Sequence, residues 1–166
     1  MKRFIVFISF VLVGVLSYAK EYYYEGLSFD TKIKNIHEYT DEAGIHVNVR
    51  DGEYDFVEIN ISKVKSRVNE ESRLEKIADN WQEAAFNNRK RIKIKSRTDI
   101  KEFEADNLYF KYVEFQYKKP EKVKKRAYVA QINGYCILLI MQFEKSAKKL
   151  EKLIKTLSFI PETNIY

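Results

Sequence analysis

Two histidines and two carboxylates lie close together near the start of the chain and are the side chains best suited to bind a metal ion. His37 and His46 flank Asp41 and Glu42. A divalent-cation site needs three or four such groups to converge on one point. His46, however, alternates with apolar neighbours, which predicts a strand in which its ring faces solvent. Because 33% of the residues are charged, we expect such groupings by chance and predict neither a metal site nor a cofactor.

The chain contains few residues suited to nucleophilic catalysis. Cys136 is the only cysteine and lies within the apolar run of residues 135–139, so we predict that it is buried and inert. No Gly-x-Ser-x-Gly turn presents a serine. Carboxylates are abundant, but no pair stands out as the acid and base of a glycosidase. We therefore assign no catalytic residue and keep a hydrolase of envelope polymers as an alternative.

Two basic runs are the strongest candidates for a binding surface. Residues 89–97 (RKRIKIKSR) and residues 118–126 (KKPEKVKKR) each contain six cations in nine positions. In one interpretation they are the solvated faces of ordinary strands, whose lysines prevent edge-to-edge aggregation. In the other they bind an anionic lipid, a cell-wall polymer or an acidic protein. The candidate partner-binding residues are Arg89, Arg91, Lys93, Lys95, Lys122, Lys124 and Lys125.

Charge is distributed unevenly along the chain. Residues 20–88 contain 9 basic and 15 acidic residues, whereas residues 89–166 contain 19 basic and 9 acidic residues. Such asymmetry is typical of a protein with a surface for an anionic partner. The alternative is that a compact fold interleaves the two halves and evens out the electrostatic field.

The first 19 residues have the pattern of a secretory signal peptide. Lys2 and Arg3 precede an apolar stretch over residues 4–16, and small residues at positions 17 and 19 suit a cleavage site. A stretch of this length is too short for a typical transmembrane helix. We therefore predict export to the periplasm or the extracellular space, no transmembrane anchor in the mature form, and no nucleic-acid partner.

Apolar periodicity predicts mostly antiparallel strands. An Asn-Gly pair at residues 133–134 lies between two apolar runs and is the strongest hairpin signal in the chain. The run at residues 137–141 is apolar without alternation, as in a central strand covered on both faces. The remaining expected segments are one short strand over residues 22–29, a polar connection over 31–43, a hairpin over 45–61, and extended segments over 92–103, 108–117 and 123–132.

Two amphipathic helices complete the prediction. Ser72 begins a capping box, and residues 72–88 carry apolar side chains at helical spacing, including Trp81, which we expect to be largely buried. The second helix covers residues 146–158, with Ser146 as its N-cap. We predict an α+β fold, an α/β/α sandwich with a central antiparallel sheet of about six strands.

The carboxy-terminal half also resembles a known family. Residues 128–140 (YVAQINGYCILLI) are followed by a polar break and by residues 153–159 (LIKTLSF). This succession of hydrophobic patterns resembles the ending of PsbP-like proteins, and the resemblance runs from Ser72 onward. It implies an α/β/α sandwich, and because the family has no shared catalytic centre it implies a fold without a function. We therefore divide the chain into a signal peptide, residues 1–19, and a single PsbP-like domain, residues 20–166.

The expected function is that of an exported, non-enzymatic binding or accessory domain that engages an anionic envelope partner through its basic runs. A further alternative rests on the 12 tyrosines and 11 phenylalanines. Aromatic residues in strands usually pack in the core, but residues 22–24 and 109–117 could instead line a pocket for a sugar or an apolar ligand.

Overall fold

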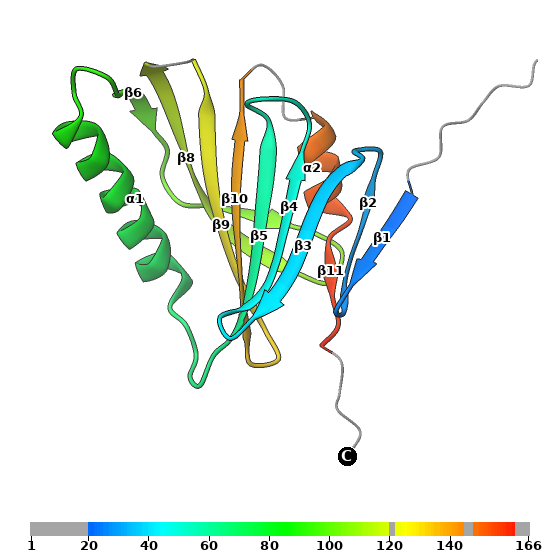
Figure 1. Ribbon diagram of the computed structural model, residues 1–166. Helices are drawn as coiled ribbons and strands as arrows, with labels where there is room; N and C mark the ends of the chain where they lie inside the picture. Colours follow the sequence, from blue (N-terminus) through cyan, green and yellow to red (C-terminus); the bar gives the residue numbers. More distant parts are fainter. Residues whose placement is uncertain (1–19, 120–121, 145–147, 162–166) are drawn as a thin grey trace, which may run out of the picture.

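The computed structural model describes residues 20–119, 122–144 and 148–161, and Figure 1 shows how their elements are arranged. The α+β class is confirmed, with two helices and a large antiparallel sheet. The predicted signal peptide lies outside the described residues. The elements are β1 (Lys20–Tyr24), β2 (Leu27–Thr31), β3 (Asn35–Asp41), β4 (Gly44–Arg50), β5 (Phe56–Lys63), α1 (Glu70–Asn87), β6 (Lys93–Arg97), β7 (Lys101–Glu104), β8 (Tyr109–Lys119), β9 (Lys124–Ile132), β10 (Tyr135–Phe143), α2 (Lys148–Lys155) and β11 (Ser158–Phe159).

The large sheet has eight strands instead of the predicted six or so. Its order is β3-β4-β5-β10-β9-β8-β6, and β7 pairs with β8 beside β6. Residues 35–41, predicted as part of a polar connection, form β3. The sequence did not show this strand because it lies at the sheet edge and is mostly exposed. An exposed edge strand needs no apolar alternation. Residues 92–103, predicted as one segment, form the two short strands β6 and β7 along the same side of β8.

The segment of residues 22–29, predicted as one short strand, belongs instead to a hairpin of two strands. β1 pairs with β2 through a turn at Glu25 and Gly26, whose φ angles are 48° and 80°. Two successive left-handed residues make the tight turn of a hairpin. The pattern of residues 22–29 was a weak signal, because Glu25 rarely takes this conformation. With β11, this hairpin forms a separate three-stranded sheet.

Different layers cover the two faces of the large sheet. On one face, α1 packs over β6, β8 and β9, where Leu74 and Ala78 meet Val113 and Ala127. On the other face, α2 and the small sheet enclose the larger core, which contains Ile137 and the other residues of this parity in β10. The second face is thus covered by a short helix together with a three-stranded sheet, which differs from the predicted helix-only layer.

The helix α1 begins earlier than predicted, since Asn69 is its N-cap and accepts a hydrogen bond from the Ser72 amide at 3.0 Å. Trp81 was predicted to be largely buried, and it packs against the core under this helix with its ring edge-on to that of Phe115 at 5.5 Å. The helix covers one part of the sheet face and leaves the strands β3 to β5 uncovered (Figure 1).

The centre of the sheet matches the predictions. β10 lies between β5 and β9, and the turn at Asn133 and Gly134 has the φ angles, 48° and 79°, of a tight hairpin. Cys136 is 1% exposed, as predicted for a buried thiol. The second helix is described over Lys148–Lys155, and its predicted N-cap, Ser146, lies outside the described residues.

Candidate functional site: the cationic end

Four elements meet at the end of the large sheet that is uppermost in Figure 1. α1 finishes there, β6 starts, β8 finishes and β9 starts. The two basic runs therefore come together, and the register makes the contact direct: Lys93 of β6 is the cross-strand partner of Lys119 of β8. The two runs, about 25 residues apart in sequence, belong to one surface.

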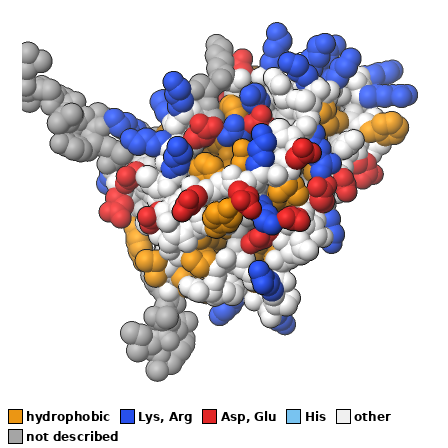
Figure 2. All heavy atoms as spheres, turned by 180° about the vertical axis from the view of Figure 1, so that it is seen from behind, with side chains coloured by type: hydrophobic (Ala, Val, Ile, Leu, Met, Phe, Trp, Pro, Cys, Tyr) orange, Lys and Arg blue, Asp and Glu red, His pale blue; other side chains and the backbone are white. Residues whose placement is uncertain are grey.

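This surface, the cationic end, consists of exposed basic side chains. Within the described ranges, no carboxylate lies within 4.0 Å of any of their charged atoms. Figure 2, which shows the molecule from behind, has its densest group of Lys and Arg side chains at this upper end, on the side of α1. The residues of the cationic end are Arg89, Lys90, Arg91, Lys93, Lys95, Lys118, Lys119 and Lys122.

A tight turn after α1 holds the first part of the cationic end. The Arg91 and Ile92 amides both donate to the Asn88 carbonyl oxygen, at 2.7 and 2.8 Å, and the Arg89 amide donates to that of Phe86 at 3.3 Å. Basic groups just beyond a helix C-terminus also interact favourably with the helix dipole. Ile92 is half-buried against the core beneath α1, which turns the flanking cations outward.

The connection from β8 to β9 holds the second part. The Tyr117 amide donates to the Val123 carbonyl oxygen at 2.8 Å, and both side chains are buried. Lys118, Lys119 and Lys122 lie on the exposed side of this connection. The apolar residues of both runs thus anchor the backbone, and the cations between them are left to solvent.

Lys125, a predicted site residue, does not belong to the cationic end. Its side chain is half-buried, and its Nζ lies 5.7 Å from the ring centroid of Tyr117 and 5.9 Å from that of Trp81. Burial lowers the pKa of the Lys125 ammonium, and the Glu58 carboxylate offsets this only in part. Burial also raises the pKa of Tyr117 to about 12. Lys125 packs its charge over two aromatic rings and presents little of it to a partner.

Lys124 has acidic and aromatic neighbours on the opposite face of the sheet, and 38% of its side chain is exposed. Its Nζ is 3.6 Å from a carboxylate oxygen of Glu114 and 6.0 Å from the ring centroid of Phe143. Of the seven predicted residues, five lie in the cationic end and two, Lys124 and Lys125, pack against other side chains.

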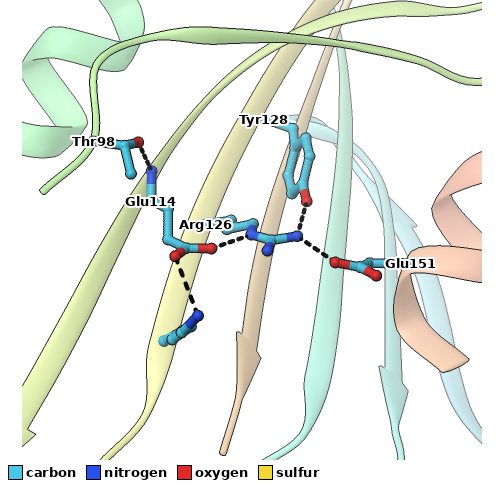
Figure 3. Close-up of polar contacts among 6 residues, drawn as sticks. Thr98, Glu114, Arg126, Tyr128 and Glu151 are labelled. Atoms are coloured by element: carbon cyan, nitrogen blue, oxygen red, sulfur yellow. Dashed lines mark hydrogen bonds and ion pairs between the residues drawn. The ribbon is translucent and has the colours of Figure 1, made fainter. Parts of the chain in front are cut away.

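The second basic run ends in an internal network around Arg126 (Figure 3). The Arg126 guanidinium donates to Glu114 and, at 2.7 Å, to Glu151 of α2, and it lies 3.3 Å from the Tyr128 hydroxyl. We call Glu114, Lys124, Arg126, Tyr128 and Glu151 the Arg126 cluster. Burial opposes the charge of Arg126, but its partners outweigh burial and raise the pKa of its guanidinium. Burial raises the pKa of Tyr128 to about 12.

The first basic run also has a paired member, Arg97, which contacts Glu75 and, at 3.9 Å, Asp79 of α1. A recess beside this pair is lined by Glu71, Glu75 and Asp99. Glu71 is in turn bound by Lys111 at 2.6 Å. Two of the three carboxylates are therefore held by cations, an arrangement that favours ion pairing over acid and base catalysis.

Part of the grouping of His37, Asp41, Glu42 and His46 forms a chain of hydrogen bonds near the uncovered edge of the large sheet. His46 bonds Asn60 through Nδ1 at 2.7 Å and Asp41 through Nε2 at 3.1 Å, and its ring stacks on that of Tyr39 at 4.6 Å. Among the described residues, no three His, Cys, Asp or Glu side chains converge as a metal site would require.

The two aromatic segments proposed as pocket residues, 22–24 and 109–117, have different surroundings in the structure. Tyr22 and Tyr23 line a cavity of about 540 Å³ between β1 and the start of β3. Its floor includes Ile33 and Ile36, and its rim carries three lysines, Lys20, Lys32 and Lys34. In β8, by contrast, Tyr112 stacks on Tyr128 of β9 and Tyr117 lies beside Phe115 of its own strand.

No protein-family model matches this chain, and no curated protein matches its sequence. Among solved structures it is similar to cyanobacterial PsbP (CyanoP) from Synechocystis sp. PCC 6803, with a TM-score of 0.56 and 10% identity, covering 89% of this chain and 96% of that one. The fold is PsbP-like. The resemblance seen in residues 128–159 is thereby confirmed at the level of the fold.

A second similar structure is that of a protein from Bacteroides thetaiotaomicron VPI-5482, with a TM-score of 0.51 and 16% identity. It covers 89% of this chain, which spans about half, 51%, of that protein's length. At such identities the likeness concerns the PsbP-like fold alone, and the site must be argued from this chain's own residues. Within the described ranges, no helix is long and apolar enough to cross a membrane.

Sequence reasoning missed three members of the cationic end as site residues, Lys90, Lys118 and Lys119, and it missed Phe86 beside them. These lysines belong to the two basic runs, so their charge was evident from the sequence. The sequence did not reveal the strand register that places Lys93 opposite Lys119. Phe86 lies outside the apolar stripe of α1, on the side of Glu75 and Asp79, and this offset is the signal that could have marked it as exposed.

Proposed function

We propose that this protein is an exported, non-enzymatic binding domain that uses its cationic end to engage an anionic partner of the cell envelope. The observation that carries the proposal is the pairing of Lys93 with Lys119, which joins two basic runs into one exposed surface. Like charges directly opposite each other across two strands are destabilising. An anionic partner would relieve this repulsion, whereas stability of the isolated domain gives no reason to retain it.

The surroundings of the cationic end support the same function. A surface of one sign raises the local concentration of a ligand of the other sign and speeds its encounter. Eight exposed cations without a described acidic neighbour meet that requirement, and the paired cations Arg97 and Arg126 do not.

The test uses heparin, a sulfated polysaccharide, as a general polyanion. Four members of the cationic end are changed together: Arg89→Glu, Lys93→Glu, Lys119→Glu and Lys122→Glu. A matched control changes four other exposed lysines, Lys32→Glu, Lys34→Glu, Lys63→Glu and Lys65→Glu. Both variants have the same net charge, so any difference in their heparin binding depends only on where the changed charges lie.

We expect the wild-type protein and the control to be retained on immobilised heparin and to elute with raised salt. The variant of the cationic end should elute at clearly lower salt than the control. Equal elution of the two variants would contradict the proposal, because binding would then follow net charge wherever it lies. Circular dichroism spectra identical to that of the wild type would show that both variants are folded.

The cavity at Tyr22 and Tyr23 favours a second candidate function, the binding of a small ligand. Its apolar floor and lysine rim suit a molecule with an apolar body and an anionic group. A fatty acid such as palmitate is a suitable probe. Calorimetric titration should show saturable binding that Ile36→Glu abolishes, and saturable binding unchanged in that variant would place the ligand elsewhere.

A further inference from the structure

Phe86 is the most exposed large hydrophobic side chain among the described residues, with 71% of its surface accessible. It lies in the last turn of α1, and its carbonyl oxygen accepts from the amide of Arg89. A large apolar group thus stands at the border of the cationic end. A phenylalanine side chain has no polar atom that can form a hydrogen bond with water, so its exposure to solvent is unfavourable.

The other exposed large hydrophobic residues have different surroundings. Tyr23 lines the cavity beside β1 and carries a polar hydroxyl, Tyr39 stacks on His46, and the Tyr109 hydroxyl donates to Glu102 at 2.6 Å. Ile160 is 69% exposed but follows β11, at the opposite end of the molecule in Figure 1. Within the described ranges, Phe86 alone of this group combines an apolar ring with unpaired basic neighbours.

We infer that the anionic partner is a lipid bilayer, with the cationic end on its head groups and the Phe86 ring inserted between them. This inference rests on the proposed function and names its partner. Anionic head groups attract clustered Lys and Arg, and an aromatic ring gains from entering the boundary between head groups and acyl chains. A hydrated polyanion offers the charge and has no apolar layer for the ring.

The charges of α1 define how the protein would lie on the bilayer. Asp79 and Glu83 are exposed on the same helix, two turns and one turn before Phe86, respectively. Their carboxylates would be repelled by anionic head groups, so the helix would meet the membrane by its end and not along its side. This orientation places Phe86, Arg89 and Lys93 nearest to the lipid.

The experiment compares three probes: vesicles of phosphatidylglycerol mixed with phosphatidylcholine, vesicles of phosphatidylcholine alone, and heparin in solution. The variant is Phe86→Ala, and its matched control is Ile160→Ala, an equally exposed apolar side chain at the other end. All proteins are compared at the same amino terminus, because the apolar residues 4–16 would by themselves hold an uncleaved chain on vesicles.

We expect Phe86→Ala to weaken binding to the anionic vesicles about fivefold, since the ring buries apolar area there, and to leave heparin binding unchanged. Ile160→Ala should change neither. If Phe86→Ala leaves vesicle binding unchanged while charge reversal of the cationic end abolishes it, the bilayer inference is overturned and the proposed function stands. If charge reversal changes binding to neither vesicles nor heparin, the proposed function itself fails.

A fluorescence measurement reports insertion directly. Because Trp81 is the only tryptophan, Phe86→Trp in a Trp81→Phe background carries a single probe at the proposed contact. Its emission should shift to the blue on the anionic vesicles and remain unchanged with phosphatidylcholine alone or with heparin. An unchanged emission on anionic vesicles that do bind the protein would contradict insertion and would favour a partner recognised by charge alone.

Discussion

The cationic end and the Arg126 cluster are made of the same basic residue types in neighbouring stretches of chain, but their surroundings differ. Arg126 lies opposite Glu114 across two strands and reaches Glu151 of α2. Lys93 lies opposite Lys119. In the first region the fold supplies the acidic partners, and in the second, within the described residues, it supplies further cations.

This difference shows that strand register, and not composition, separates structural cations from available ones. Lys122 and Arg126 both belong to the run of residues 118–126, yet one is exposed and the side chain of the other is 17% exposed between two carboxylates. A charged pair taken out of water becomes part of the fold's stability. A surface cation contributes little to that stability and remains free for binding.

The largest expected effect concerns the Arg126 cluster. Arg126→Met would leave Glu151 without its partner and Glu114 with Lys124 alone, so we expect the free energy of unfolding to fall by about 2 to 3 kcal/mol, less than for a fully buried pair. Urea denaturation measures it. The same substitution at the cationic end, Arg89→Met, should change stability by no more than about 0.5 kcal/mol. Equal losses in the two variants would remove the distinction between the regions.

An intermediate effect is expected at Lys125, whose pKa burial lowers. The unfolded chain then holds the proton more tightly than the folded one, so stability should rise with pH as the solution passes from the folded pKa toward about 10.5. Lys125→Met should lack this rise and be more stable than the wild type near neutral pH, by about 0.5 to 1 kcal/mol. Urea denaturation at several pH values below 10, before the tyrosines titrate, tests this. Parallel pH profiles would show Lys125 to be solvated like the cationic end.

The smallest effect concerns repulsion within the cationic end. Lys119→Ala removes one of two like charges that face each other across β6 and β8. We expect a gain in stability of about 0.3 kcal/mol at low salt, and none at high salt, where the repulsion is screened. The control is Lys63→Ala, an exposed lysine whose cross-strand partner is the uncharged Tyr135. A loss of stability at low salt would mean that Lys119 has an attractive partner.

The features that sequence reasoning predicted well depend on short stretches of chain. The turn at Asn133 and Gly134 follows from two residues that accept positive φ. The burial of Cys136 follows from the apolar run around it. The PsbP-like fold was visible in the succession of a hairpin, a polar break and a helix over residues 128–159.

The features that sequence reasoning missed depend on distant partners. Strand β3 has almost no buried side chain, so its pairing with β4 left no apolar pattern to detect. The three-stranded sheet on the other face was missed because β1, β2 and β11 come from the two ends of the described chain. The assignment of Lys124 and Lys125 to the binding surface was weakened for the same reason, because their partners Glu114 and Trp81 lie elsewhere in the sequence.

Lysine footprinting of the unaltered protein tests the central claim most directly. Each exposed lysine is acetylated in proportion to its accessibility, and mass spectrometry compares the rates with and without phosphatidylglycerol-containing vesicles. The account predicts slowed modification of Lys93, Lys119 and Lys122 and unchanged rates at the control positions, Lys32 and Lys63. Equal slowing at all positions, or slowing confined to the control lysines, would contradict the assignment of the binding surface to the cationic end.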